Sequence, residues 1–408
     1  MMLKKSDVDI RFNARGLGAM VKILLVFAVL LLLSACAADN TLPDRSSAPS
    51  LPAAGTTPTG AAIAEAATST STPTNPTPPP PTATVTIEPT ATVEPEATAT
   101  SEPPTPTPEP EPTYQQFNLP EGSRPHDIAP APDGSVWYTA QGSGEIGRLD
   151  PASSTVSTIA LGAGSAPHGV IVGPDGAAWI TDAGLNAIVQ VDPETEQVTR
   201  FSMPAGRDNV NLNTATFDGN GTLWFTGQNG VYGSLNPDNG EIAVYDAPEG
   251  RGPYGITTTP DGAVYYASLA GNHIARIDTE TGGVTVIEPP TPDQGARRVW
   301  SDSQGRIWVS ESSAGQVSVY DPAAESWQQW LLPGDNPQPY AVYVDERDIV
   351  WLSDFGSNAL VSFDPETQTF ESYPLPGSPS NVRQILGRPG EIWGAESGVN
   401  GLVVLRLQ

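Results

Sequence analysis

Histidine and cysteine, two residue types that often carry out acid–base, nucleophilic or metal chemistry, are rare in this sequence. Its 408 residues include three histidines, His126, His168 and His273, and one cysteine, Cys36. No lysine or cysteine follows Cys36, so the rest of the chain has no amine for a Schiff base and no thiol nucleophile. His126 and His168 each follow a proline and lie 42 residues apart, whereas we expect His273 in a surface loop. The histidines, the carboxylates, the serine and threonine hydroxyls and the tyrosines remain as possible chemistry. The 42-residue interval indicates how His126 and His168 are positioned.

The 42-residue interval belongs to a sevenfold repeat. An aromatic residue that follows an Asp-Gly-like turn recurs every 41 to 45 residues, at Trp137, Trp179, Trp224, Tyr265, Trp308, Trp351 and Trp393. Each repeat holds four short apolar stretches separated by turn residues such as Pro-Asp-Gly and Asp-Pro. Four strands per repeat are typical of a propeller blade. We therefore predict an all-β fold over residues 114–408, a seven-bladed β-propeller of four-stranded blades.

The strand count predicts how this ring closes. The seventh repeat reaches Gln408 after only three strands, and a single strand-like stretch, residues 114–120, precedes the first repeat. We expect this N-terminal strand to pair as the outer strand of blade 7. Such pairing would remove an exposed sheet edge.

Propeller geometry brings dispersed residues to one rim of the central channel. In each blade, the start of the innermost strand and the end of the second strand lie on the same face. The innermost strands would contribute His126, His168, Tyr254, Arg297, Arg298, Tyr340 and Arg383, and the second strands Asp182, Glu311, Asp354 and Glu396. Two interpretations of the arginines stay open: they pair with Glu311, Asp354 and Glu396, or they bind an anionic or carbonyl-rich ligand.

Residues 167–195 carry a recognisable unit. Pro-His-Gly-Val, Pro-Asp-Gly, Trp-Ile-Thr-Asp and Val-Asp-Pro-Glu-Thr follow one another there, and the chain resembles the virginiamycin B lyase family, the streptogramin B lyases, over residues 114–408. The resemblance implies two histidines in adjacent blades, a divalent metal, usually magnesium, and elimination that opens a cyclic depsipeptide at its ester. The implied catalytic residues are His126 and His168, and the implied metal ligand is Asp182. Ala166 stands where the family has a second carboxylate.

Two other functions stay open, because related propellers share much of this pattern. One is a non-catalytic, NHL-like binding or scaffold propeller, whose partner would be a small molecule, a peptide or a cell-surface ligand. The other is a gluconolactonase-like, metal-dependent hydrolase. Residues 114–408 hold 13 arginines against 35 aspartates and glutamates, a net charge of −22, which argues against nucleic acid as a partner. We expect a monomer.

The residues before the propeller predict where it works. Residues 1–35 combine basic residues with an apolar run at 23–33, and Leu33-Ser34-Ala35-Cys36 resembles the lipobox of a bacterial lipoprotein signal peptide. We therefore expect a lipid on Cys36 that anchors the protein to the cell membrane, outside the cytoplasm. Residues 36–113 hold 18 prolines and 19 threonines but no aromatic residue, which predicts a disordered tether. A single cysteine excludes a disulfide framework.

Overall fold

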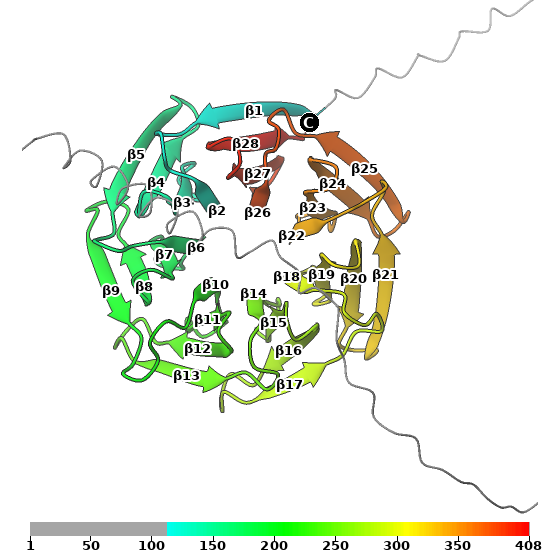
Figure 1. Ribbon diagram of the computed structural model, residues 1–408, viewed down its shortest axis with the longest axis horizontal. Helices are drawn as coiled ribbons and strands as arrows, with labels where there is room; N and C mark the ends of the chain where they lie inside the picture. The colour runs from blue at the N-terminus through cyan, green and yellow to red at the C-terminus, as the bar shows by residue number, and fades with distance from the viewer. Residues whose placement is uncertain (1–111, 408) are drawn as a thin grey trace, which may run out of the picture. The chain divides into compact units, whose positions relative to one another are not determined.

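The computed structural model describes residues 112–407, which form a seven-bladed β-propeller around a central channel (Figure 1). Each blade is a four-stranded antiparallel sheet. We name its strands a to d from the channel outward. No helix long and apolar enough to cross a membrane occurs among residues 112–407. The predicted signal peptide, Cys36 and the tether lie outside the described residues.

The strand bounds follow the repeat. Blade 1 is β2 (Pro125–Pro130), β3 (Val136–Ala140), β4 (Glu145–Asp150) and β5 (Thr155–Ala160); blade 2 is β6 (Pro167–Val172), β7 (Ala178–Asp182), β8 (Ala187–Val191) and β9 (Val198–Ser202). Blade 3 is β10 (Leu212–Phe217), β11 (Leu223–Gly227), β12 (Val231–Leu235) and β13 (Ile242–Asp246); blade 4 is β14 (Pro253–Thr258), β15 (Val264–Ser268), β16 (His273–Ile277) and β17 (Val284–Ile287). Blade 5 is β18 (Ala296–Ser301), β19 (Ile307–Glu311), β20 (Gln316–Asp321) and β21 (Ser326–Leu331); blade 6 is β22 (Pro339–Val344), β23 (Val350–Asp354), β24 (Ala359–Asp364) and β25 (Thr369–Pro374). Blade 7 is β26 (Val382–Arg388), β27 (Glu391–Glu396), β28 (Gly401–Arg406) and, from the other end of the chain, β1 (Thr113–Asn118).

The repeated aromatic residue is linked to the turn that precedes it. In blades 3, 5 and 6 the indole N–H of strand b donates to an aspartate six residues earlier, at 2.9 to 3.0 Å: Trp224 to Asp218, Trp308 to Asp302 and Trp351 to Asp345. The same carboxylates accept backbone N–H groups of the turn between strands a and b. The fixed spacing of turn and aromatic in the sequence therefore has a local cause.

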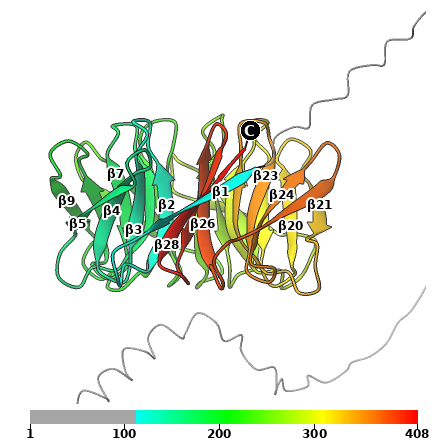
Figure 2. The ribbon, with the colours of Figure 1, turned by 90° about the horizontal axis from the view of Figure 1, so that it is seen from above.

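The N-terminal strand closes the ring as expected. β1 pairs with β28 from Thr113↔Arg406 to Asn118↔Gly401, and it forms the outer strand of blade 7 in Figures 1 and 2. Phe117 is buried and stacks on Trp393 of β27, with ring centroids 5.6 Å apart. Closure thus joins the two ends of the described residues within one sheet, and this aromatic contact supports the pairing.

Every blade has a β-bulge at the same place on its innermost strand. Two residues of strand a oppose one residue of strand b, and the bulge pairs are His126/Asp127, His168/Gly169, Asn213/Thr214, Tyr254/Gly255, Arg297/Arg298, Tyr340/Ala341 and Arg383/Gln384. A bulge bends the strand and changes the direction of its side chains. These seven pairs, which we call the bulge layer, line one end of the channel.

Hydroxyl groups on strand b hold the bulges and link neighbouring blades. Thr181 of blade 2 accepts the N–H of Gly169 in its own bulge at 2.9 Å and donates to the carbonyl of Asn213 in blade 3. Thr139, Thr226 and Ser310 make the same pair of bonds in blades 1, 3 and 5. The bulge layer is therefore fixed both within and between blades.

Candidate functional site

The two histidines of the bulge layer lie against each other. The ring centroids of His126 and His168 are 3.8 Å apart, and their exposed fractions are 3% and 6%. His126 Nδ1 is 2.8 Å from Asp127 Oδ1, so Nδ1 carries the proton donated to this carboxylate and Nε2 is left as the basic nitrogen. His168 Nδ1 lies 3.1 Å from the carbonyl oxygen of Asn213, and its Nε2 lies 3.2 Å from Nδ2 of the same residue.

A buried ion pair supports His126 from behind. Arg298 Nη2 lies 3.0 Å from Asp127 Oδ1, and Arg298 Nη1 lies 3.4 Å from Asp127 Oδ2. Arg298 Nη1 also donates to Thr214 Oγ1 at 2.8 Å. Both charged residues are 2% exposed. The result is a chain of contacts from Arg298 through Asp127 to His126.

Tyrosines and further arginines occupy the opposite part of the layer. The hydroxyls of Tyr254 and Tyr340 are hydrogen-bonded to each other, and Arg297 Nη1 donates to Tyr254 at 3.3 Å. The Arg297 guanidinium lies 4.1 Å from the Tyr340 ring centroid and 5.1 Å from that of Tyr254. Arg383 Nη1 lies 3.5 Å from the Tyr340 hydroxyl. Cationic and aromatic groups are therefore interleaved at this end of the channel.

Burial and the arginines shift the pKa values of the layer. Burial, followed by the neighbouring guanidinium groups, lowers the pKa of His126 well below the ordinary histidine value. Burial, followed by His126, also lowers the pKa of His168, so both imidazoles are neutral near pH 7. Burial raises the pKa of Asp127, although Arg298 opposes that rise. Burial alone would raise the pKa of the Tyr340 phenol, but the guanidinium groups outweigh it and the pKa is lowered.

The four strand-b carboxylates do not join the bulge layer. Asp182 accepts hydrogen bonds from Ser165 Oγ at 2.5 Å and from the backbone N–H groups of Ala166 and Leu185, both at 2.9 Å. Asp354 likewise accepts N–H groups from the loops at residues 338 and 356–357, Glu311 binds Gln316 and Ser318 of β20, and Glu396 accepts Gln116 of β1. These carboxylates therefore support loops and outer strands.

The bulge explains this difference from the expected rim. Asp182 is paired in register with Pro167, not with His168, and the other three carboxylates are likewise paired with the residue before the bulge. Paired residues share a face of the sheet, and the next residue along a strand points to the other face. Hence the end of strand b and the first bulge residue point in different directions.

Two residues differ from the interpretation of the sequence. Asp127 was missed as a site residue, although it follows His126 directly at a position where three other blades have glycine or alanine. His273, expected in a surface loop, is the first residue of β16 and is buried, with Nδ1 lying 3.1 Å from the Gly271 carbonyl oxygen.

A cavity of about 320 Å³ lies in the channel next to the bulge layer. Asp127, Thr214 and Arg298 line its polar end, and residues farther along the innermost strands, such as Phe217 and Leu386, line its apolar part. The ion pair of the layer is thus also part of a cavity wall.

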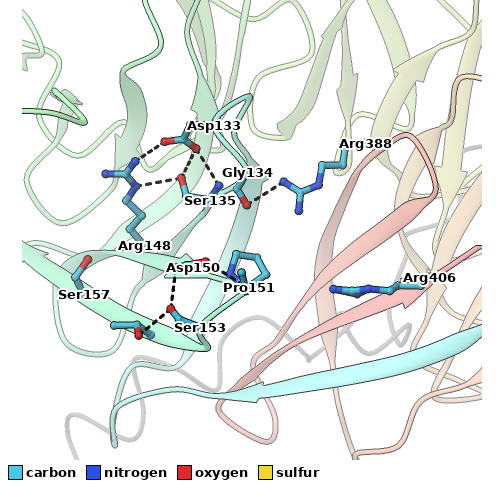
Figure 3. A pocket seen from close by; sticks show the side chains of 12 residues that line it. Asp133, Gly134, Ser135, Arg148, Asp150, Pro151, Ser153, Ser157, Arg388 and Arg406 are labelled. Carbon is cyan, nitrogen blue, oxygen red and sulfur yellow. Dashed lines mark hydrogen bonds and ion pairs between the residues drawn. The ribbon is translucent and has the colours of Figure 1, made fainter.

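A larger hollow, about 810 Å³, lies at the other end of the blades, at the seam between blades 1 and 7 (Figure 3). Arginines line it, but they bond to the fold. Arg148 donates to Ser135 Oγ and to the carbonyl of Pro193 in blade 2, each at 3.0 Å, and Arg388 of blade 7 donates to the Gly134 carbonyl of blade 1 at 3.0 Å. These contacts link blade 1 to blades 2 and 7, which gives the arginines of the hollow a structural role. We therefore take the bulge layer as the candidate site.

A sequence profile of the virginiamycin B lyase family matches residues 112–404. The chain belongs to the virginiamycin B lyase family. No curated protein matches it. A solved streptogramin B lyase structure is 25% identical, with a TM-score of 0.67 over 73% of this chain and 98% of that one.

Two further solved structures show the same fold at lower identity. A catalytically inactive virginiamycin B lyase from Staphylococcus aureus with quinupristin is 23% identical, with a TM-score of 0.68 over 73% of this chain and 100% of that one. YCF48 bound to D1 peptide is 15% identical, with a TM-score of 0.58 over 72% and 95% of the two chains.

For this member of the virginiamycin B lyase family, the expected magnesium ion can be tested against the donor atoms. His126, Asp127 and His168 each place one candidate ligand atom within 4.8 Å of the others. Magnesium prefers oxygen ligands in octahedral geometry, but two of these three donors are nitrogens. The one carboxylate is ion-paired with Arg298, and Asp182 is bound to loop groups. The donor set therefore does not fit magnesium.

Proposed function

We propose that the bulge layer binds a ligand that presents a carboxylate or carbonyl group to its arginines. The observation that carries this proposal is the composition of the layer. It gathers Arg297 and Arg383 with two tyrosines and two histidines, and its one carboxylate, Asp127, is already paired with Arg298. Guanidinium groups favour carboxylate and carbonyl oxygens, and a cationic layer in a chain of net charge −27 favours such ligands locally.

Titration calorimetry with matched peptides tests the binding proposal. Each peptide is supplied with a free carboxylate and as the corresponding amide. We expect the carboxylate form to bind at least about tenfold more tightly, corresponding to about 1.4 kcal/mol, and Arg383→Gln to abolish the difference. Arg347→Gln, an exposed arginine in the a–b turn of blade 6, is the matched control. Equal affinity for both forms in the wild-type protein would refute the proposal.

A specific observation also supports an elimination reaction. His126 is neutral near pH 7, and Asp127 orients it so that Nε2 is the basic nitrogen. In the proposed reaction, Nε2 takes a proton from the carbon α to a carbonyl of a cyclic depsipeptide. The electron pair left on that carbon forms a carbon–carbon double bond as the ester carbon–oxygen bond breaks, and the carboxylate leaves. Family membership supports this carbon–oxygen lyase chemistry, and the ring of His168 lies beside the base, tilted by 44° with the centroids 3.8 Å apart.

Mass spectrometry separates the remaining alternatives. Quinupristin is incubated with the protein, with and without magnesium and with and without a chelator. Elimination yields a linear product of unchanged mass and new retention time, and His126→Asn should abolish it, whereas Arg347→Gln should not. A product heavier by one water would instead indicate a gluconolactonase-like hydrolase. Absence of product under every condition, together with retained ligand affinity, would leave the binding function alone.

The lipid anchor at Cys36 is part of the same proposal. A membrane-attached propeller would present the bulge layer to small molecules, peptides or cell-surface ligands outside the cytoplasm. Labelling cells with a fatty-acid analogue tests it. We expect label on the wild-type protein and none on Cys36→Ala; unlabelled wild-type protein would contradict the anchor.

A further inference from the structure

The carboxylate of the bulge layer is already neutralised by a cation that belongs to the protein. Arg298 approaches both oxygens of Asp127, at 3.0 and 3.4 Å, and both side chains are buried. A guanidinium remains protonated at every physiological pH, so this positive charge is permanent.

We propose that Arg298 is the resident cation of the layer and holds the place at Asp127 that a divalent metal would need. His126, Asp127 and His168 are close enough to one another to hold an ion, and both imidazoles are neutral. A metal ion bound to Asp127 would, however, be in contact with the guanidinium of Arg298. Two positive charges in contact repel strongly in a buried site, where little water screens them.

Arg298 is also held where it is. It donates to Thr214 Oγ1 at 2.8 Å, and its guanidinium lies 5.3 Å from the ring centroid of Tyr254. Its backbone N–H is fixed by Ser310 Oγ at 3.1 Å. Displacing Arg298 to admit a metal would break these contacts and leave a buried positive charge without its ion-pair partner.

This inference deepens the proposed function, since it makes Arg298 a positioning residue. Arg298 orients Asp127, and Asp127 holds the Nδ1 proton of His126. The inference about Arg298 is tested by metal uptake, whereas the proposed function is tested by ligand affinity and by product formation. Either one can therefore fail while the other is supported.

The first experiment uses the full-length wild-type protein. It is dialysed separately against magnesium, manganese and zinc chlorides, and bound metal is counted by plasma mass spectrometry. We expect no stoichiometric uptake and no change of the thermal midpoint on adding a chelator. One metal per chain, with a midpoint lowered by the chelator, would overturn the proposal without any variant.

The second experiment uses Arg298→Met, which removes the charge and keeps most of the apolar stem. Asp127 then lies beside two neutral imidazoles, a nitrogen-rich set that suits manganese or zinc better than magnesium. We expect uptake of one ion per chain. At metal concentrations about a hundredfold above the dissociation constant, the thermal midpoint should rise by about 4 °C.

Two controls make this gain specific. The double variant Asp127→Asn/Arg298→Met should take up no metal. Arg306→Met removes a guanidinium from Asp302, a buried aspartate in blade 5 that lies outside the bulge layer, and this variant should also take up no metal. A folded Arg298→Met protein that binds no metal would refute the proposal. If Arg298→Met does not fold, Arg298→Gln, which keeps a donor toward Asp127, takes its place beside the wild-type measurement.

Discussion

The closing strand β1 offers the sharpest test of how the propeller is held together. Phe117→Ala removes the phenyl ring that lies on Trp393, while the backbone pairing of β1 with β28 is left intact. Phe117 is 4% exposed and packs in one cluster with Leu119, Ile128 and Trp393. The substitution therefore creates a cavity between the N-terminal strand and the ring that it closes.

The expected loss follows from the burial. Phenylalanine-to-alanine substitutions in protein cores cost roughly 3–5 kcal/mol, and the position on an outer strand favours about 3 kcal/mol. A folded unit of about 300 residues has an unfolding entropy near 0.6 kcal/mol per kelvin, at about 2.1 cal/mol/K per residue. The thermal midpoint should therefore fall by about 5 °C.

Thermal and urea unfolding, followed by near-ultraviolet circular dichroism, measure this loss. Gln115→Ala is the matched control, because Gln115 lies on the same strand, is exposed and pairs with Val404 through its backbone. We expect its midpoint to stay within about 1 °C of the wild type. Equal midpoints for Phe117→Ala and Gln115→Ala would show that the ring does not depend on this contact.

Three further predictions concern the candidate site. The pKa values of His126 and His168 are lowered on folding, so the unfolded chain binds more protons below about pH 6.5 and stability falls as the pH drops from 7 to 5. Asp127, whose pKa is raised, acts in the opposite sense, so the contribution of His168 is isolated by comparing His168→Gln with the wild type. The urea midpoint should fall less between pH 7 and pH 5 in His168→Gln than in the wild type; equal falls in the two proteins would contradict the lowered pKa of His168. Thr181→Val leaves a bulge N–H and a carbonyl of the next blade without their shared hydroxyl and should cost about 1–3 kcal/mol in urea unfolding; an unchanged midpoint would remove the proposed link between blades. Asp182→Ala removes three hydrogen bonds to loop groups and should lower the free energy of unfolding by about 3 kcal/mol in the same assay. Ligand affinity measured by calorimetry should be retained; a loss of affinity without a loss of stability would show that Asp182 takes part in ligand binding.

The blade count and the closure could be predicted because their causes are local. In blades 3, 5 and 6 an aspartate binds both the turn and the tryptophan six residues later, as Asp302 binds Trp308, so these blades share one short signature in the sequence. The missing fourth strand of blade 7 and the surplus strand at the N-terminus then fix the closure by counting.

The candidate site was predictable only in part, because the bulge is a property of pairing between strands. The repeat places His168 and Asp182 at the same end of one blade, but only the register shows that Asp182 is paired with Pro167. A signal was nevertheless present. Threonine or serine recurs just before the last residue of strand b in most blades, as at Thr181, and this hydroxyl binds the bulge.

The closing strand also decides how the propeller would respond to mechanical force. A pull on the residues before Thr113 enters the ring through β1 and must pass through its six pairs with β28. Force along the strand loads these pairs together in shear, whereas force across it opens them one at a time, beginning at Thr113 and Arg406. The pairing of β1 with β28, which completes the ring, is therefore also the pairing that we expect to separate first when the N-terminus is pulled. A propeller held by its N-terminus would resist best when pulled along β1.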